Sequence, residues 1–282
     1  MKNIFVVGAG TMGLDIARVF AEHGMDVAVR DITEEIVANA AKKLDATLEK
    51  LISRGRLSAG AAAELRGRIR FTVDLAPAKD ADLVLEAIVE RADLKIGVFR
   101  ELDALCRPEC VFCSNTSSIS ITQMAAASGR PDRFIGMHFF NPAPVMKLIE
   151  VTRSLTTSDE TFRAVYDLCV RLGKEPVEVK DSPGFVVNRI LVPMMNEAAF
   201  LLYEGVASAE DIDKAVALGA NHPMGPLHLA DLVGIDVVLH VCDVLFEETH
   251  DPKFRACVLL RQMVRAGKLG RKTGEGFFRY EI

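Results

Sequence analysis

A glycine-rich loop between an apolar run and an amphipathic helix constrains the fold of this chain more than any other feature. The run Ile4–Val7 leads directly into Gly8-Ala-Gly10-Thr11-Met12-Gly13, and a helical pattern continues to His23. Glycines at this spacing permit a tight turn, and the free amides at the start of the helix can face a phosphate. The motif alone is weak, but its context predicts a dinucleotide site formed by Gly8, Gly10, Thr11, Met12 and Gly13.

Strand and helix signals alternate through the first half of the chain. Eight short apolar runs are expected to be strands: Ile4–Val7, Val27–Val29, Ile69–Thr72, Leu83–Ala87, Val111–Ser114, Phe134–His138, Lys147–Val151 and Pro176–Val179. Strands that are apolar throughout and separated by helices are typical of a parallel sheet covered on both faces. We therefore predict an α/β fold with a doubly wound sheet.

The strand signals stop after Asp181, and helical patterns take over. Helices are expected over Phe185–Tyr203, Ser208–Leu218, Pro226–Glu248 and Phe254–Ala266. We place the domain boundary near Pro183, which gives a dinucleotide-binding domain over residues 1–182 and an all-α domain over residues 183–282.

The first of these helices, Phe185–Tyr203, is apolar on nearly every face and must be surrounded by other protein. Burial within one monomer and burial between two subunits both satisfy this requirement. We favour a homodimer formed through the helical domain.

Asp31 closes the second predicted strand at the position from which an acidic side chain can bind the ribose diol of a dinucleotide. A carboxylate there repels a 2′-phosphate, so the sequence favours NAD over NADP. Arg30 is adjacent and keeps NADP open as the less favoured coenzyme.

The charge and hydropathy of the chain exclude several classes of partner. The net charge is −5, which gives no basic footprint for nucleic acid or an anionic membrane surface. No apolar run reaches the roughly 18 residues that a membrane-spanning helix needs. No signal peptide precedes the first strand, and six cysteines without disulfide-scaffold spacing fit a reducing cytoplasm.

Three of the cysteines, Cys106, Cys110 and Cys113, are close enough in sequence to suggest a metal site. No histidine and no second cysteine pair accompany them, so a ligand set is incomplete. Cys113 also lies in a predicted buried strand, where cysteine behaves as a small hydrophobic residue. We therefore predict ordinary packing and no metal.

His138 and Glu150 are the most informative candidates for chemistry. They lie on two strand-like runs joined by an Asn-Pro-Ala-Pro turn, so the chain can double back and bring the two side chains together. A carboxylate that orients an imidazole is a common way to build a general base. The alternatives are a satisfied core histidine and an exposed strand carboxylate.

Other polar residues follow the ends of strands, where ligands bind in parallel sheets. Glu90 and Lys95 come after the fourth strand and could reach the reactive end of a dinucleotide, or they could be part of a solvated helix start. Asn115 and Ser117 follow the fifth strand and suit hydrogen bonding to a ligand, although residues of this type also cap helices. Asn188 lies one turn into an apolar helix, where its amide needs either a backbone carbonyl or a substrate as a partner.

An insertion over about residues 36–68 is longer than a crossover helix requires. It combines an apolar helical stripe with basic residues, including Lys50 and Arg54. It could be a solvated helical hairpin or a basic arm for a substrate that carries phosphate, and the residues favour neither interpretation.

Taken together, the motifs resemble the 3-hydroxyacyl-CoA dehydrogenase family, and most closely its single-function bacterial branch. The resemblance covers Met1 to Tyr280. It rests on the glycine loop at Gly8 and on five further motifs: Ser114-Asn-Thr-Ser-Ser, His138-Phe-Phe-Asn-Pro-x-Pro, Asp181-x-Pro-Gly-Phe-x-x-Asn188-Arg, His222-Pro-Met-Gly-Pro and Gly270-Arg-Lys-Thr-Gly-x-Gly-Phe.

This resemblance implies a Rossmann-type NAD domain, a helical C-terminal domain that dimerises, and an acyl-CoA substrate. It implies that His138 is the catalytic base and Glu150 its partner, and that Ser117 and Asn188 hold the substrate. It implies coenzyme contacts from Asp31, Glu90, Lys95, Asn115, Ser117, Asn141 and Lys272. It also favours the basic-arm interpretation, with Thr47, Lys50 and Arg54 as contacts to coenzyme A.

The reaction expected from the resemblance is the reversible oxidation of an (S)-3-hydroxyacyl-CoA, with 3-hydroxybutyryl-CoA as the favoured substrate. One alternative is a dehydrogenase of free hydroxy acids, because the resemblance extends to L-gulonate dehydrogenases and related lens crystallins. A second alternative is an NAD-binding protein without catalytic activity.

Overall fold

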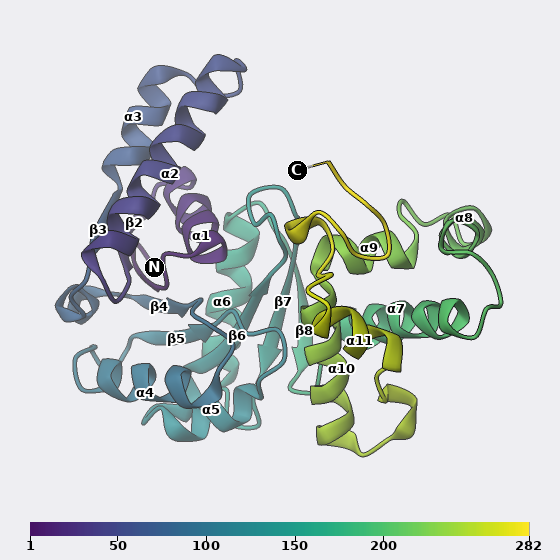
Figure 1. The fold of residues 1–282 in the computed structure, drawn as a ribbon. Helices are drawn as coiled ribbons and strands as arrows, with labels where there is room; N and C mark the ends of the chain where they lie inside the picture. The colour runs from purple at the N-terminus through teal and green to yellow at the C-terminus, as the bar shows by residue number, and fades with distance from the viewer. Residues whose placement is uncertain (282) are drawn as a thin grey trace. The chain divides into compact units, whose positions relative to one another are not determined.

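The computed structural model describes residues 1–281 of the chain. The chain divides into two compact units, one from Met1 to Ser182 and the other from Pro183 onward (Figure 1). The first unit is built on a β-sheet, and the second consists of helices.

An eight-stranded sheet forms the centre of the N-terminal unit, in the order β3-β2-β1-β4-β5-β6-β7-β8. The strands are β1 (Asn3–Val7), β2 (Asp26–Arg30), β3 (Ile69–Thr72), β4 (Leu83–Glu86), β5 (Val111–Ser114), β6 (Phe134–Phe139), β7 (Leu148–Arg153) and β8 (Glu175–Lys180). All eight predicted strands are therefore confirmed. Neighbouring strands run parallel except β6 and β7, which are antiparallel. The connections reverse direction between β1 and β4, and ligands bind beyond the carboxyl ends of the strands at such a point.

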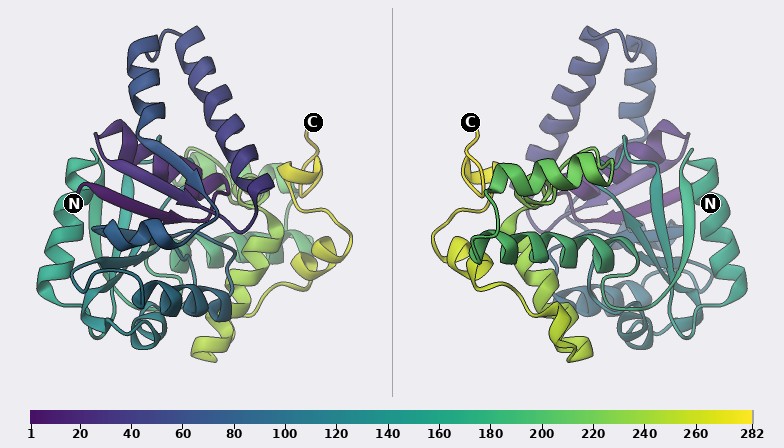
Figure 2. Two further views of the ribbon diagram at one scale, coloured as in Figure 1. Left: turned by 90° about the vertical axis from the view of Figure 1, so that its left-hand side faces the viewer. Right: turned by 90° about the vertical axis from the view of Figure 1, so that its right-hand side faces the viewer.

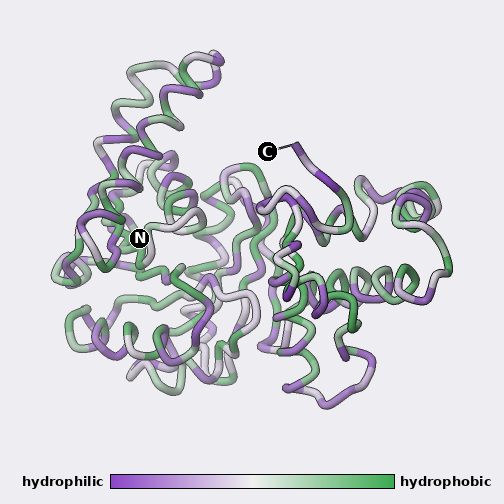
Figure 3. Tube along the Cα trace, in the orientation of Figure 1, coloured by the Kyte–Doolittle hydropathy of each residue, from purple (hydrophilic) through white to green (hydrophobic). Residues whose placement is uncertain are grey.

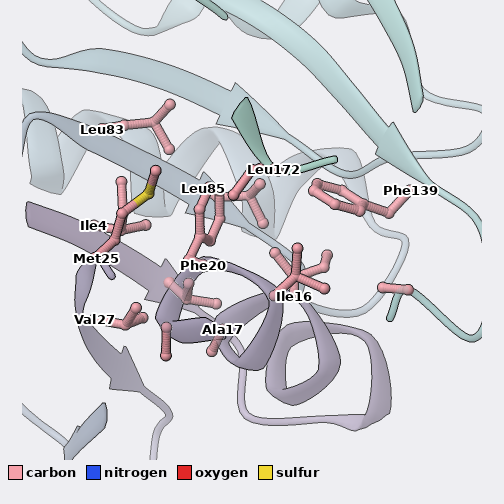
Figure 4. Close-up of a cluster of buried hydrophobic side chains, with 14 of the residues drawn as sticks. Ile4, Ile16, Ala17, Phe20, Met25, Val27, Leu83, Leu85, Phe139 and Leu172 are labelled. Carbon is pink, nitrogen blue, oxygen red and sulfur yellow. The ribbon is translucent and has the colours of Figure 1, made fainter. Parts of the chain in front are cut away.

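Helices cover both faces of this sheet, as expected for a doubly wound fold. The helices beside the sheet are α1 (Thr11–Glu22), α4 (Ala92–Asp103), α5 (Ile121–Ala127) and α6 (Asp159–Arg171), with short 3-10 turns η1 (Ala76–Asp80) and η2 (Pro131–Arg133). Side chains alternate between the faces of each strand, so Ile4 and Val6 of β1 pack into a core with α1 and α6 (Figure 4). On the other face, the ring of Phe99 lies 4.7 Å from that of Phe134.

The insertion after β2 is a helical hairpin that projects from the sheet (Figure 2). It consists of α2 (Glu34–Ser53) and α3 (Ala59–Gly67). The side chains of Thr33 and Ser58 cap the two helices by accepting hydrogen bonds from backbone amides three residues on. Polar and apolar segments alternate along both helices, and the turn at the tip is hydrophilic (Figure 3). Arg66 of α3 donates to Asp45 of α2 over 2.7 Å, which holds the two helices together.

The C-terminal unit contains five α-helices within the described residues. They are α7 (Val187–Tyr203), α8 (Ala209–Gly219), α9 (Pro226–Val233), α10 (Ile235–Thr249) and α11 (Val258–Arg265), with 3-10 turns η3 (Pro252–Phe254) and η4 (Arg271–Thr273). Its core lies between α7, α9, α10 and α11.

Two of the predicted helices were wrong in extent. The expected helix Pro226–Glu248 is broken at Gly234, which has a φ of +105° and so cannot continue a right-handed helix. The expected helix Phe254–Ala266 begins only at Val258, because the side chain of Asn196 binds the backbone of the preceding segment. Its Nδ2 donates to the carbonyl of Arg255, and its Oδ1 accepts from the amide of Cys257.

The first long helix is not surrounded within the described chain, so burial inside one monomer is not met and burial between two subunits stays a prediction. Only one side of α7 is buried, through Val192, Met195, Asn196, Ala198 and Ala199. Ile190, on the same helix, is 64% exposed. An open groove on this unit is lined by Ile190, Pro193 and Met194 together with Lys253 and Phe254.

The described cysteines are all free and buried. The predicted buried strand around Cys113 is confirmed as β5, and the thiol of Cys106 donates to the carbonyl of Ala78 over 3.4 Å. No cluster of three or more metal-ligating side chains occurs within residues 1–281. Over the same range, no helix has both the length and the apolar character needed to cross a membrane.

Candidate active site

The antiparallel pairing of β6 and β7 places His138 directly opposite Glu150 in the strand register. Both side chains are enclosed, with exposed fractions of 5% and 1%. The imidazole Nδ1 lies 2.8 Å from Glu150 Oε2. An ionised carboxylate only accepts hydrogen bonds, so in the neutral imidazole this contact fixes the proton on Nδ1, which donates, and leaves the lone pair on Nε2.

The other imidazole nitrogen faces the loop that follows β5. Ser117 Oγ lies 3.1 Å from His138 Nε2. Because β5 and β6 are parallel neighbours, their carboxyl ends meet at one edge of the sheet, and this brings the two residues together. Ser117, His138 and Glu150 thus form a continuous hydrogen-bonded series that ends in a hydroxyl group.

Glu90 holds the loop that carries Ser117. Its Oε1 accepts hydrogen bonds from the hydroxyl groups of Thr116 and Ser118 and from the amides of Ser117 and Ser118. Burial raises the pKa of the Glu90 carboxyl, but Lys95 and these donors more than offset the effect, so the pKa lies below its ordinary value. Glu90 therefore stays ionised at neutral pH and keeps the loop in place.

Lys95 is 1% exposed, and its ammonium group lies between two carboxylates. Its Nζ is 2.7 Å from Glu86 Oε1 and 3.0 Å from Glu90 Oε2. The predicted contacts of Glu90 and Lys95 with the coenzyme remain predictions. Sequence reasoning did not single out Glu86, although a carboxylate that ends an otherwise apolar strand was a signal that could have identified it.

The glycine loop has the geometry that a bound dinucleotide requires. A Cβ atom on Gly8 would lie 2.4 Å from the carbonyl oxygen of Ala87, and one on Gly13 would lie 1.9 Å from that of Gly8, so both positions need glycine. By contrast, a Cβ on Gly10 would meet nothing within 4 Å. No side chain caps α1 at Gly10, so the amides of its first turn, including those of Thr11 and Met12, remain directed at this open space. These residues fit the pyrophosphate of NAD.

Asp31 lies beside this loop at the end of β2. Its Oδ2 accepts a hydrogen bond from the amide of Ala9 over 2.7 Å, and its Oδ1 accepts from the amide of Ile32. The guanidinium of Arg30 donates instead to the carbonyl of Val73. The carboxylate, rather than the guanidinium, is therefore bonded to the glycine loop.

Two asparagines that are predicted coenzyme contacts lie near the His138–Glu150 pair. Asn115 Oδ1 accepts from the amide of Phe139 over 2.8 Å, which ties the end of β5 to the end of β6 next to His138. Asn141 is exposed at the start of the turn between β6 and β7.

The predicted coenzyme A contacts lie in the second half of α2 and at its end. Lys50 and Arg54 are exposed, and Thr47 is half-buried, with its hydroxyl donating to the carbonyl of Lys43. The structure therefore exposes the two predicted cationic contacts, Lys50 and Arg54, on the projecting hairpin.

Asn188 and Lys272 belong to the C-terminal unit. Asn188 is the second residue of α7. Lys272 lies in η4, where its Nζ is 2.7 Å from Asp236 Oδ2. The glycine-rich segment around Lys272 is held by backbone hydrogen bonds within its own unit, such as that from the amide of Gly270 to the carbonyl of Glu275 over 3.0 Å.

A buried carboxylate that the sequence did not reveal anchors this tail. Asp231 of α9 accepts hydrogen bonds from the amides of Phe277 and Phe278 and from the hydroxyl of Tyr280. Burial, together with the Asp231 carboxylate, raises the pKa of Tyr280 to about 12, so its phenol remains a donor.

The sheet order, the glycine loop and a buried histidine–carboxylate pair at the strand ends define a nicotinamide-dependent dehydrogenase. Sequence comparison identifies the family. Residues 3–182 match the family described as 3-hydroxyacyl-CoA dehydrogenase, NAD binding domain, and residues 184–280 match 3-hydroxyacyl-CoA dehydrogenase, C-terminal domain. The chain belongs to the 3-hydroxyacyl-CoA dehydrogenase family.

Individual relatives match along the whole chain. A 3-hydroxybutyryl-CoA dehydrogenase of Clostridioides difficile is 48% identical over 278 residues, which covers 99% of each chain. One of Bradyrhizobium diazoefficiens is 45% identical over 280 residues, covering 99% of this chain and 96% of its own. The crystal structure of (S)-3-hydroxybutyryl-CoA dehydrogenase from Ralstonia eutropha is similar with a TM-score of 0.96 and 48% identity, covering 100% of both chains.

Proposed function

We propose that this protein interconverts (S)-3-hydroxybutyryl-CoA and acetoacetyl-CoA with NAD(H). The observation that carries the proposal is the position of His138, held between Glu150 on Nδ1 and Ser117 on Nε2. The names of the full-length relatives supply the substrate.

In the oxidative direction, His138 Nε2 removes the proton from the C3 hydroxyl group of the substrate. Ser117 Oγ already lies 3.1 Å from this nitrogen, so it can share a hydrogen bond with the same hydroxyl and orient it. Bound NAD⁺ supplies the acceptor for the hydride that leaves C3.

The imidazolium formed in this step is stabilised by Glu150, because a nearby carboxylate favours the charged form of histidine. In the reductive direction, His138 starts protonated and returns the proton to the C3 oxygen. Asn188 is assigned as a second contact to the substrate, on the basis of its motif.

The glycine loop and Asp31 would hold the coenzyme, with Glu90, Lys95, Asn115, Asn141 and Lys272 as further contacts. Asp31 supports NAD over NADP, because its carboxylate lies against the glycine loop and repels a 2′-phosphate.

The direct test is the reduction of acetoacetyl-CoA, followed by absorbance, with NADH and NADPH side by side. We expect turnover with acetoacetyl-CoA and a preference for NADH. Activity on free hydroxy acids but not on the thioester would make the protein a hydroxy-acid dehydrogenase. Tight NADH binding without turnover on either class would identify a non-catalytic binding protein.

The hairpin of α2 and α3 is assigned to the coenzyme A part of the substrate, through Thr47, Lys50 and Arg54. We expect Arg54→Gln to raise the KM for acetoacetyl-CoA about 2- to 5-fold at low salt with little change in kcat, because an exposed ion pair contributes about 1 kcal/mol at most. The KM for an acetoacetyl thioester that lacks the nucleotide should not change.

The matched control is Arg100→Gln, which removes an exposed arginine from α4 of the same unit. It should leave both KM values unchanged. An equal rise in KM for both thioesters in Arg54→Gln would remove the hairpin from substrate binding.

We also propose that the protein is a homodimer formed through the C-terminal unit and that it acts in the cytoplasm. The exposed apolar side of α7 supports the dimer, since Ile190 is 64% exposed within the described chain. A mass of 30.8 kDa in sedimentation equilibrium, that of a single chain, would contradict it. The free thiols support a reducing compartment.

A further inference from the structure

We propose that Glu86, a residue with no role in the reaction described above, is a positioning residue for His138. The inference rests on the proposed function for its kinetic meaning, but its structural basis lies entirely within the N-terminal unit. Glu86 is the last residue of β4 and is fully buried. It begins a network of hydrogen bonds that ends at the catalytic imidazole.

Glu86 accepts hydrogen bonds from three donors. Lys95 Nζ and the amide of Ile88 both donate to Oε1 over 2.7 Å. The hydroxyl of Ser114, which is opposite Glu86 in the register of β4 and β5, donates to Oε2 over 2.6 Å. Both carboxylate oxygens therefore act as acceptors, and the three donors can be satisfied only if both do so.

One route from Glu86 to the Ser117 loop runs through the ion pair. Lys95 Nζ binds Glu86 on one side and Glu90 Oε2 on the other. Glu90 Oε1 is the acceptor for the amides of Ser117 and Ser118. The buried carboxylate of Glu86 and the half-buried carboxylate of Glu90 share one ammonium group. A loss of charge at Glu86 therefore leaves Glu90 as the only charged partner of Lys95 and changes the position of the Glu90 carboxylate.

A second route runs through a single hydroxyl group. Ser114 gives its only proton to Glu86 Oε2, and its oxygen accepts a hydrogen bond from the amide of Thr116 over 3.2 Å. Thr116 is the residue before Ser117. The hydrogen bond to Glu86 thus fixes the orientation of the Ser114 hydroxyl, and this hydroxyl in turn holds the backbone amide next to Ser117.

Glutamine at position 86 has the same shape as glutamate but cannot accept at both ends. If its oxygen keeps the hydrogen bonds from Lys95 and Ile88, its amide nitrogen faces Ser114 as a donor. The Ser114 hydroxyl, which is also a donor there, must then rotate away. If the amide is reversed, its nitrogen faces Lys95 and the amide of Ile88, which are themselves donors. In either orientation, at least one of the two routes is broken while the side-chain volume is kept.

The test compares Glu86→Gln with a matched control, Asp103→Asn. The control weakens another ion pair of the same unit, between the buried Arg130 and the half-buried Asp103 at 2.7 Å, which is not part of the network. For each variant we would measure the Tm, the kcat for acetoacetyl-CoA, and the NMR titration of the His138 imidazole in protein free of coenzyme and substrate. The His138 signal is assigned by its absence in His138→Gln.

We expect both variants to lower the Tm. Glu86→Gln alone should lower kcat, by about 10- to 100-fold, because a small misplacement of a catalytic group has effects of this size. It should also change the His138 titration, which a residue that only supports stability would leave as in the wild type. A titration curve identical to that of the wild type would overturn the proposal, even if kcat falls.

If Glu86→Gln does not fold, Ser114→Ala provides the second test. It keeps the ion pair of Glu86 and Lys95 and breaks only the route through the hydroxyl. A changed His138 titration supports the proposal, and an unchanged one overturns it. Because the titration needs neither coenzyme nor substrate, it remains decisive even if the wild type fails to reduce acetoacetyl-CoA, a result that would count against the proposed function alone.

Discussion

Replacement of His138 by glutamine should lower kcat for acetoacetyl-CoA reduction by at least about 10²-fold, the usual contribution of a general acid or base. The glutamine amide can still donate to Glu150, so the buried carboxylate keeps a partner and the protein should fold. It cannot exchange a proton with the C3 oxygen at neutral pH. The measurement is steady-state kinetics with NADH, accompanied by NADH binding, which should stay near the wild-type affinity.

The matched control is His23→Gln. His23 follows α1 in the same unit and is exposed, with Nδ1 contacting only the carbonyl of Val19 among the hydrogen bonds of the described structure. Its replacement should leave kcat unchanged. Near-full activity of His138→Gln would remove His138 from the reaction and with it the observation that carries the proposed function.

Glu150→Gln is the companion variant for the same pair. It should lower kcat, because a neutral amide stabilises the imidazolium formed in the reaction less than a carboxylate does. A wild-type kcat in this variant would remove Glu150 from its assigned role.

Gly10→Ala should weaken NADH binding at least about tenfold, which corresponds to ~1.4 kcal/mol, while the Tm without coenzyme stays at the wild-type value. A Cβ at this position meets no protein atom within 4 Å, and the backbone φ of −67° suits alanine. The space it enters is the space that the pyrophosphate requires. The Kd for NADH, measured by fluorescence titration, and the Tm separate binding from folding.

Gly60→Ala is the control for this change. Gly60 lies in α3, and a Cβ there also meets nothing within 4 Å. It should leave the Kd for NADH unchanged and raise stability by about 0.5–1 kcal/mol, as alanine does in a helix. An unchanged Kd in Gly10→Ala would contradict the assignment of the loop to the coenzyme.

The parallel sheet could be predicted from sequence because its strands are short, apolar and bounded by turn or helix signals. The same local information predicted the meeting of His138 and Glu150, since a short turn leaves two adjacent runs few ways to pair. The break at Gly234 could not be predicted, because a single glycine is also tolerated inside a helix. The start of α11 depends on Asn196, which is distant in sequence.

The supports of the site were the least predictable part. The position of Glu90 and Lys95 after a strand end left a coenzyme contact and a solvated helix start open, and the family resemblance favoured the coenzyme. The structure adds that they hold each other and the Ser117 loop, with Glu86 beneath them. Such contacts join residues from β4, α4 and the loop after β5, and no periodicity in the sequence records them.

The antiparallel register of β6 and β7 makes the length of the turn between them a condition for the pairing of His138 with Glu150. His138 faces Glu150 only in the observed register, and a slip of one residue would bring Ile149 or Val151 opposite it. A slip of two would bring Leu148 or Thr152. The length of this turn is therefore constrained independently of its sequence, because a single inserted or deleted residue has to be absorbed within the turn or His138 loses its carboxylate partner.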